Sequence, residues 1–140
     1  MKRSQRLDSV LRLARSRERE AAARLVQARH QLSQRQELQQ QLLRHQSEYR
    51  EQAKSQATIP ASAIKVRRAF VGQLQRAFEQ QAGAIEAARK QVEQARRDWL
   101  AQRVRFQSIE KARKQMRDDE ALSENKAEQR RLDELSSSRR

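Results

Sequence analysis

The side chains of this sequence that could do chemistry are two histidines and a large surplus of arginine. His30 and His45 stand fifteen residues apart, the chain has no cysteine, and no paired acidic residues surround either histidine. Zinc and similar metals need about three or four such ligands held together. The sequence also lacks a glycine-rich phosphate loop, a nucleophile elbow and a convergent carboxylate pair. We therefore predict no metal site, no cofactor and no catalytic residue, that is, a protein that is not an enzyme.

The surplus of basic residues points to an acidic partner. The chain has 32 Lys and Arg against 18 Asp and Glu, a net charge of +14, which suits nucleic acid, an anionic lipid surface or an acidic protein. No zinc-ligand spacing, RNA-binding aromatic motif or basic-zipper layout is present. We expect nonspecific nucleic-acid binding at low salt and no specific recognition. The arginines singled out as contacts to an acidic partner are Arg12, Arg15, Arg19, Arg103, Arg105 and Arg113.

The composition favours long helices over a globular core. Only 4% of the residues are aromatic and 36% are charged, which leaves too few large apolar groups to enclose a core. Ala, Leu, Gln, Glu and Arg occur throughout, and all are good helix formers. No segment approaches the ~20 apolar residues of a membrane span, and the N-terminus lacks the apolar run of a signal peptide. We expect a soluble helical protein that is not exported by a signal peptide.

Apolar residues recur at alternating spacings of four and three on both sides of Pro60, the only proline. Such a heptad pattern predicts two helices that pack along a seam. Before Pro60 the seam positions are Leu7, Leu11, Ala14, Glu18, Ala21, Leu25, Ala28, Leu32, Arg35, Gln39, Leu42, Gln46, Tyr49 and Ala53. After it they are Ile64, Arg67, Val71, Leu74, Phe78, Gln81, Ile85, Ala88, Val92, Ala95, Trp99, Gln102, Phe106, Ile109, Arg113 and Met116.

If the chain reverses at Pro60, residues that face each other have numbers that add to about 120. Small residues then meet large ones, with Ala14 opposite Phe106 and Ala21 opposite Trp99, as expected of interlocking core layers. We predict an all-α fold: a long two-helix antiparallel coiled-coil hairpin, with the turn around Pro60 and a C-terminal helical overhang.

The predicted hairpin is a single coiled-coil domain of residues 1–140. We expect helix one at about residues 5–57, the turn at 58–61, helix two at about 61–135 and a frayed tail at 136–140. Residues 118–140 lie beyond the reach of the first helix. Two interpretations of this segment stay open, a frayed tail and a helix that docks onto another molecule.

The hairpin gathers positive charge at its open end and apolar residues near its turn. Residues 1–24 carry a net charge of +5 and residues 96–117 a net charge of +6, whereas residues 118–140 carry −2. Near the turn, Tyr49 and Phe70 are expected to form a partly exposed apolar patch, because Phe70 stands one position before the seam residue Val71. Two different binding surfaces are the expected result.

Several stretches, in order along nearly the whole chain, resemble the flagellar export protein FliJ family. They are Glu48, Tyr49 and Arg50 late in the first helix, Phe70, Leu74 and Ala77 early in the second, Trp99, and the segment ENKAEQRRLDEL at 124–135. The resemblance implies a cytoplasmic coiled-coil stalk of bacterial flagellar type III protein export, peripherally associated with the inner membrane at the flagellar base. It also implies a role in flagellum biogenesis, and through it in motility and chemotaxis.

The resemblance further implies three kinds of partner. Proteins of this family bind the hexameric export ATPase ring and promote its assembly, bind the cytoplasmic domain of the export gate membrane protein, and engage export chaperones. The basic open end, with the six arginines named above, is expected to enter the ring. The positions that correspond to gate binding are Leu42, His45, Tyr49, Phe70, Leu74, Ala77 and Gln81.

Two alternatives stay open. One is the equivalent stalk of a virulence type III secretion system, for which the argument from shape is the same. The other is a basic coiled-coil scaffold or nucleic-acid-binding protein. The salt dependence of binding distinguishes the second alternative from a stalk, because binding to nucleic-acid phosphates weakens steeply as the salt concentration rises.

Overall fold

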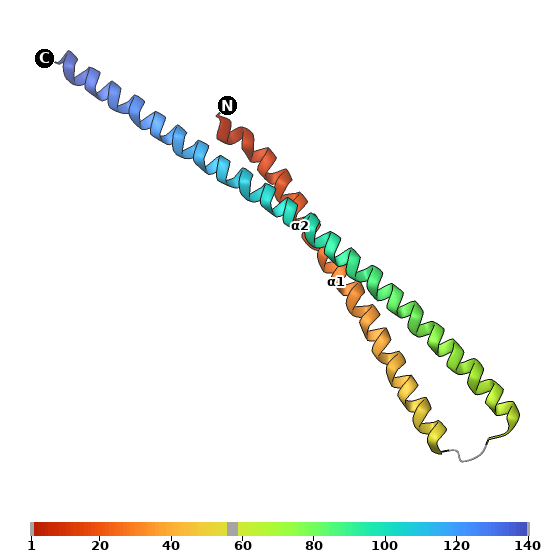
Figure 1. The fold of residues 1–140 in the computed structure, drawn as a ribbon. Coiled ribbons are helices and arrows are strands. Elements are labelled where there is room, and N and C mark those ends of the chain that lie inside the picture. Colours follow the sequence, from red (N-terminus) through yellow and green to blue (C-terminus); the bar gives the residue numbers. More distant parts are fainter. Residues whose placement is uncertain (1, 56–58, 140) are drawn as a thin grey trace. The chain divides into compact units, whose positions relative to one another are not determined.

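The computed structural model describes residues 2–55 and 59–139. They form two helices, α1 (Arg3–Ser55) and α2 (Ala61–Ser138), and this part of the chain contains no strand (Figure 1). The chain divides into two compact units, each with a segment of both helices. We call Met1–Ala21 with Asp98–Arg140 the terminal unit, and Ala22–Arg97 the central unit.

The second helix begins at the chain's only proline. Pro60 lies directly before α2, and its carbonyl accepts hydrogen bonds from the backbone N–H groups of Ala63 at 3.0 Å and Ile64 at 3.3 Å. A proline is tolerated here because the first N–H groups of a helix have no intrahelical acceptor, so a missing donor costs nothing. The expected end of helix one at 56–57 and the first turn residue, Thr58, lie outside the described residues.

In both units the helix segments run antiparallel. In the terminal unit, rising numbers on α1 meet falling numbers on α2, in the contacts Ser4 with Glu120, Asp8 with Arg113 and Glu18 with Trp99. In the central unit Tyr49 meets Phe70. The numbers of these pairs add to about 120, so the predicted antiparallel helical hairpin and its register are confirmed.

Small residues make up most of the buried seam. The buried apolar side chains are all at predicted seam positions: Ala14, Ala21, Leu25, Ala28, Ile85 and Ala88. Alanine lets two helix backbones approach closely, and larger side chains such as Trp99 and Phe106, both half-buried, fill the remaining space. The alternation of small and large residues along the seam therefore provides the close packing that a hydrophobic core provides in a globular protein.

Three residues predicted for the seam are exposed instead, and those predictions were wrong. Arg35 is exposed, Ile64 is 41% exposed and Val71 is 48% exposed. At the start of α2 it is Phe70, itself 40% exposed, whose ring contacts Tyr49 of α1, so Phe70 rather than Val71 faces the first helix.

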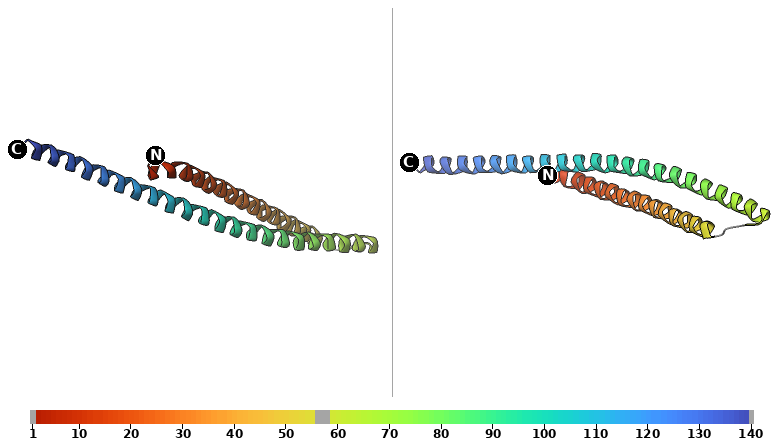
Figure 2. Two further views of the ribbon diagram at one scale, coloured as in Figure 1. Left: turned by 90° about the horizontal axis from the view of Figure 1, so that it is seen from above. Right: turned by 60° about the horizontal axis from the view of Figure 1, so that its bottom comes forward.

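The last part of α2 continues past the start of α1 within the terminal unit (Figure 2). Residues 121–139 are all exposed. They form the C-terminal overhang, and the helix includes residues 136–138, where the sequence predicts a frayed tail.

A larger side chain at Ala21 tests the seam. Ala21 is 0% exposed, so Ala21→Leu should lower the free energy of unfolding by about 1–3 kcal/mol through overpacking. Urea unfolding followed by circular dichroism measures it. The control Ala23→Leu makes the same change at an exposed position and should stay within about 0.5 kcal/mol of the parent. Equal losses in the two variants would contradict the seam.

Candidate functional site

A polar layer built around Trp99 lies inside the seam of the terminal unit. The indole Nε1–H donates a hydrogen bond to Glu18 Oε1 at 2.9 Å. The guanidinium of Arg103 lies 5.6 Å from the centre of the Trp99 ring and 3.8 Å from the same carboxylate oxygen. Only 16% of the Glu18 side chain is exposed, so these two neighbours replace water around its charge. The layer therefore favours one register of α1 on α2.

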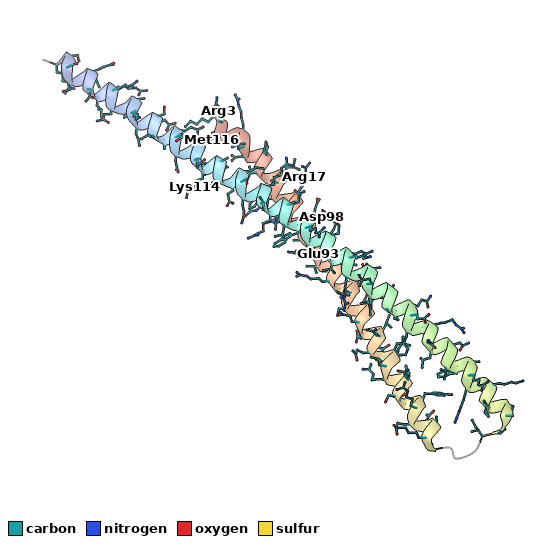
Figure 3. The ribbon with its side chains drawn as sticks, in the orientation of Figure 1. Arg3, Arg17, Glu93, Asp98, Lys114 and Met116 are labelled. Atoms are coloured by element: carbon teal, nitrogen blue, oxygen red, sulfur yellow. The ribbon has the colours of Figure 1, made fainter. Side chains whose placement is uncertain are left out.

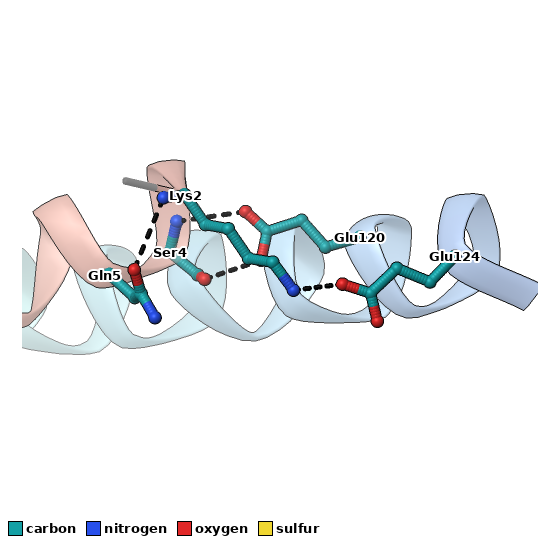
Figure 4. Close-up of polar contacts among 5 residues, drawn as sticks. All are labelled: Lys2, Ser4, Gln5, Glu120 and Glu124. Carbon is teal, nitrogen blue, oxygen red and sulfur yellow. Dashed lines mark hydrogen bonds and ion pairs between the residues drawn. The ribbon is translucent and has the colours of Figure 1, made fainter.

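A second polar contact lies where α1 begins (Figure 4). Ser4 is 4% exposed, and its hydroxyl donates a hydrogen bond to Glu120 Oε2 at 2.6 Å, while its backbone N–H donates to Glu120 Oε1 at 3.3 Å. Beside it, Lys2 forms an ion pair with Glu124. The first N–H groups of a helix lack intrahelical acceptors. Glu120 of α2 supplies an acceptor for the backbone N–H of Ser4 and so caps the start of α1.

These contacts shift the pKa values of Glu120 and Lys2 in opposite directions. The Ser4 hydroxyl lowers the pKa of Glu120 below the ordinary 4.5, and the hydrogen bond and charge of Glu124 raise the pKa of Lys2 above 10.5. The stabilisation through Glu120 is present above the ordinary carboxyl pKa and is lost as the pH falls through the lowered value. The stabilisation through Lys2 is present below the ordinary lysine pKa and is lost as the pH rises through the raised value.

Three of the six arginines singled out from the sequence are engaged within the terminal unit. Arg113 pairs with Asp8, and 23% of its side chain is exposed. The Arg15 guanidinium lies 5.6 Å from the centre of the Phe106 ring, and Arg103 belongs to the polar layer. The charge of Arg113 in particular stabilises the packing of α1 on α2 through its ion pair with Asp8.

The other three arginines are free to meet a partner. Arg12, Arg19 and Arg105 are exposed and have no ion-pair partner among residues 2–55 and 59–139. Arg12 and Arg19 stand seven residues apart and so lie on one face of α1. Arg3 and Arg17, labelled in Figure 3, add exposed positive charge to the same helix.

In the central unit an aromatic pair marks the positions that the resemblance assigns to gate binding. The ring centroids of Tyr49 and Phe70 are 4.6 Å apart, with the rings tilted by 40°. Phe70 is 40% exposed, as expected of a partly exposed patch, whereas Tyr49 is half-buried. Of the remaining positions His45 is exposed, and four are half-buried: Leu42, Leu74, Ala77 and Gln81.

Two polar atoms of this region are buried without a hydrogen-bond partner in the described part of the chain, Tyr49 Oη and Gln81 Oε1. A buried hydroxyl without a partner lowers stability, because its bonds to water are lost and not replaced. Tyr49 therefore stabilises this region through the contact of its ring with Phe70 and not through its hydroxyl. A partner that approaches here meets the exposed side of Phe70 rather than the Tyr49 hydroxyl.

The sequence analysis missed the polar contacts between the helices of the terminal unit. These are Lys2 with Glu124, Ser4 with Glu120, Asp8 with Arg113, and Glu18 with Trp99 and Arg103. A signal was present, because the numbers of these pairs also add to roughly 120 under an antiparallel register. The register had been applied to apolar and seam residues alone.

Neither a metal site nor a membrane span is found in the part of the chain that the structure describes. In residues 2–55 and 59–139 no three His, Cys, Asp or Glu side chains are grouped so as to hold a metal ion. None of the helix segments in these ranges has the length and apolar character needed to cross a bilayer.

Comparison with known proteins gives a family match. The family model described as "Flagellar FliJ protein" matches residues 2–140. Searches of curated proteins and of solved structures found no match to the chain.

Removing the Ser4 hydroxyl tests the contact at the start of α1. Ser4→Ala should melt at a lower temperature than the parent at neutral pH. The difference should shrink as the pH falls below the ordinary carboxyl pKa of 4.5, because a protonated Glu120 accepts hydrogen bonds more weakly. Circular dichroism melts across the acid range measure this.

The matched control is Ser9→Ala, which removes an exposed hydroxyl from the same helix and should show no such dependence on pH. If the difference between Ser4→Ala and the parent stays constant into acid, the charge of Glu120 has no part in the contact.

Proposed function

We propose a function from the family: the chain belongs to the FliJ family of flagellar proteins, and we infer that it is a stalk of the flagellar type III export apparatus. In this role the terminal unit binds the hexameric export ATPase ring and promotes its assembly. The central unit contacts the cytoplasmic domain of the export gate, and the protein also engages export chaperones. It acts in the cytoplasm, associated with the inner membrane at the flagellar base, without catalytic residues or cofactors.

The observation that carries this proposal is the set of free arginines on the terminal unit. Within this unit, residues 1–21 and 98–117 each carry a net charge of +4, and Arg12, Arg19 and Arg105 are exposed without ion-pair partners among the described residues. Charges arranged in this way attract an acidic surface from a distance and raise the rate of association. An acidic wall inside a protein ring is a surface of this kind.

The polar layer supports a mechanical role. A stalk that couples a ring to a gate must not let its two helices slide past each other under load. Sliding α1 along α2 separates Glu18 from Trp99 and Arg103 and leaves a buried charge without partners, which costs about 3–5 kcal/mol in measured cases.

The proposed gate contact rests on the exposed part of Phe70. Aromatic side chains that are partly exposed and held by packing on one side are common centres of binding energy at protein interfaces. Tyr49 holds the Phe70 ring in place from α1. Leu42, Leu74 and Ala77 are half-buried, and we expect their exposed parts to add apolar contacts.

Reversing the free arginines tests the ring contact. Arg12→Glu, Arg19→Glu and Arg105→Glu, combined in one chain, should weaken binding to the purified flagellar export ATPase by about tenfold or more, because attraction becomes repulsion. Calorimetry at moderate salt measures the affinity.

The control for these reversals makes the same change of charge in the central unit, at the exposed residues Arg68, Arg76 and Arg89. This triple Glu variant should bind the ATPase as the parent does. Equal weakening in both triple variants would show that net charge alone matters and that the terminal unit is not the site.

A pair of substitutions tests the gate contact. Phe70→Ala should weaken binding to the cytoplasmic domain of the export gate by about tenfold. Tyr49→Phe should leave it unchanged, because the lost hydroxyl is buried. Val26→Ala removes a side chain that is 65% exposed and serves as the control for calorimetry and melting. A lower melting temperature with intact gate binding in Phe70→Ala would assign the pair to packing alone.

A further inference from the structure

The first part of α2 carries positive charge without any negative charge. Residues 61–78 contain four basic residues and no acidic one, whereas residues 79–97 contain four basic and three acidic residues. Lys65, Arg68 and Arg76 are exposed and have no ion-pair partner among residues 2–55 and 59–139. Positive charge that is not interspersed with acidic residues attracts an anionic surface.

Two aliphatic side chains of the same segment are left uncovered by α1. Ile64 is 41% exposed and Val71 is 48% exposed. Both stand at the seven-residue spacing that leads, further along α2, to the buried Ile85. At the start of α2 the residue that contacts α1 is Phe70 instead. An apolar spacing that the neighbouring helix does not cover suits a second, partly apolar surface.

The uncovered aliphatic side chains and two of the basic ones share one side of the helix. Spacings of four and three place Ile64, Arg68 and Val71 on this side, and Lys65 adjoins Ile64 there. We call these four residues the basic-aliphatic face. Successive residues of an α-helix point ~100° apart. Phe70, whose ring packs on α1, therefore projects from a different side of α2.

Basic and aliphatic side chains on one face are typical of a helix that lies on an anionic membrane. The aliphatic side chains enter between the lipid headgroups, while Lys and Arg reach the lipid phosphates. Nucleic acid would pair with Lys65 and Arg68 but would leave Ile64 and Val71 in water. An acidic protein surface is ordinarily positioned by charges of both signs, and residues 61–78 have only one.

The electrostatics around the face agree with an anionic partner. Two acidic residues late in α1 lie beside basic groups of their own helix, Glu48 at 3.8 Å from His45 and Glu51 at 3.6 Å from Lys54. The first turn of α2 contains no acidic residue, so the partial positive charge at the start of this helix adds to that of the basic side chains.

We propose that the basic-aliphatic face binds the surface of an anionic phospholipid membrane, with Ile64 and Val71 among the headgroups and Lys65 and Arg68 on the lipid phosphates. The proposal rests on the proposed function for its setting, because the export gate brings this end of the hairpin to a membrane. Two aliphatic and two basic side chains bind weakly and reversibly by themselves. The gate contact through Phe70 raises the effective concentration of the face at the bilayer.

A label on the face tests the contact, because the chain has no cysteine of its own. Val71→Cys, nuclease-treated, carries an environment-sensitive fluorophore and is mixed with vesicles of equimolar phosphatidylglycerol and phosphatidylcholine. Its emission should shift to the blue and be quenched by spin-labelled lipids. The control Val104→Cys places the label at a position of α2 with 60% exposure and should show little of either change. No ATPase or gate is present, so this test can fail while the proposed function holds.

Cosedimentation with the same vesicles separates the aliphatic contact from general charge. Ile64→Gln with Val71→Gln leaves the net charge unchanged and should weaken binding by about tenfold, with helicity checked by circular dichroism. The matched control is Val26→Gln with Val104→Gln, two aliphatic residues that are 65% and 60% exposed. This control should bind the vesicles as the parent does.

A second pair of variants tests the charges of the face. Lys65→Gln with Arg68→Gln should weaken vesicle binding several-fold more than Arg12→Gln with Arg19→Gln, which removes the same charge from the terminal unit. Vesicles of phosphatidylcholine alone should bind little of the parent chain.

Three results would overturn the proposal. Equal emission changes at the two labelled positions would show that net charge alone brings the chain to the vesicles, as would equal losses in the matched pairs of variants. Failure to bind the mixed vesicles at low salt would exclude the membrane contact. An emission shift of the Val71→Cys label with RNA or with the purified gate domain, and none with vesicles, would assign the face to that partner instead.

Discussion

The hydrogen bond from the Trp99 indole to the Glu18 carboxylate fixes the register on which the other contacts of the terminal unit depend. Glu18 is largely removed from water, and only this register gives its charge both the indole and the guanidinium of Arg103. Apolar seams alone tolerate a slide of one heptad, because alanine can replace alanine. A buried carboxylate does not tolerate it. The same register brings Ser4 to Glu120 and so determines where the overhang of α2 begins.

The register of α1 on α2 also determines which charged side chains remain free to bind a partner. Arg113 lies in the seam beside Asp8, whereas Arg12 and Arg19 project from α1 without ion-pair partners among the described residues. A pair of long helices presents mainly extended surfaces, so its binding energy is expected to come from surfaces of this kind. The chain offers exposed arginines in the terminal unit, an aromatic pair in the central unit and an exposed helical overhang. These three surfaces suit partners of different chemistry.

The fold could be predicted from the sequence because a heptad spacing records which side of a helix each residue faces. Ala21 was placed correctly in this way, and it is fully buried. The start of α2 was misjudged, because Phe70 and Val71 are both apolar and only a contact with α1 selects Phe70 for the seam. The register implies that Ser4 and Glu120 lie near each other, but only side-chain length and direction decide that they form a hydrogen bond. The gate-binding role of residues near the turn was assigned only through family resemblance, because packing and binding both use large apolar side chains there.

The proposed assembly of the ATPase ring around this helix pair is tested most directly by light scattering of the purified flagellar export ATPase, with and without the chain, at moderate salt. A stalk seated in the ring should raise the ATPase mass to that of a hexamer with the chain bound, because a central helix pair bridges the subunits that surround it. An ATPase mass that the folded chain leaves unchanged would contradict the stalk.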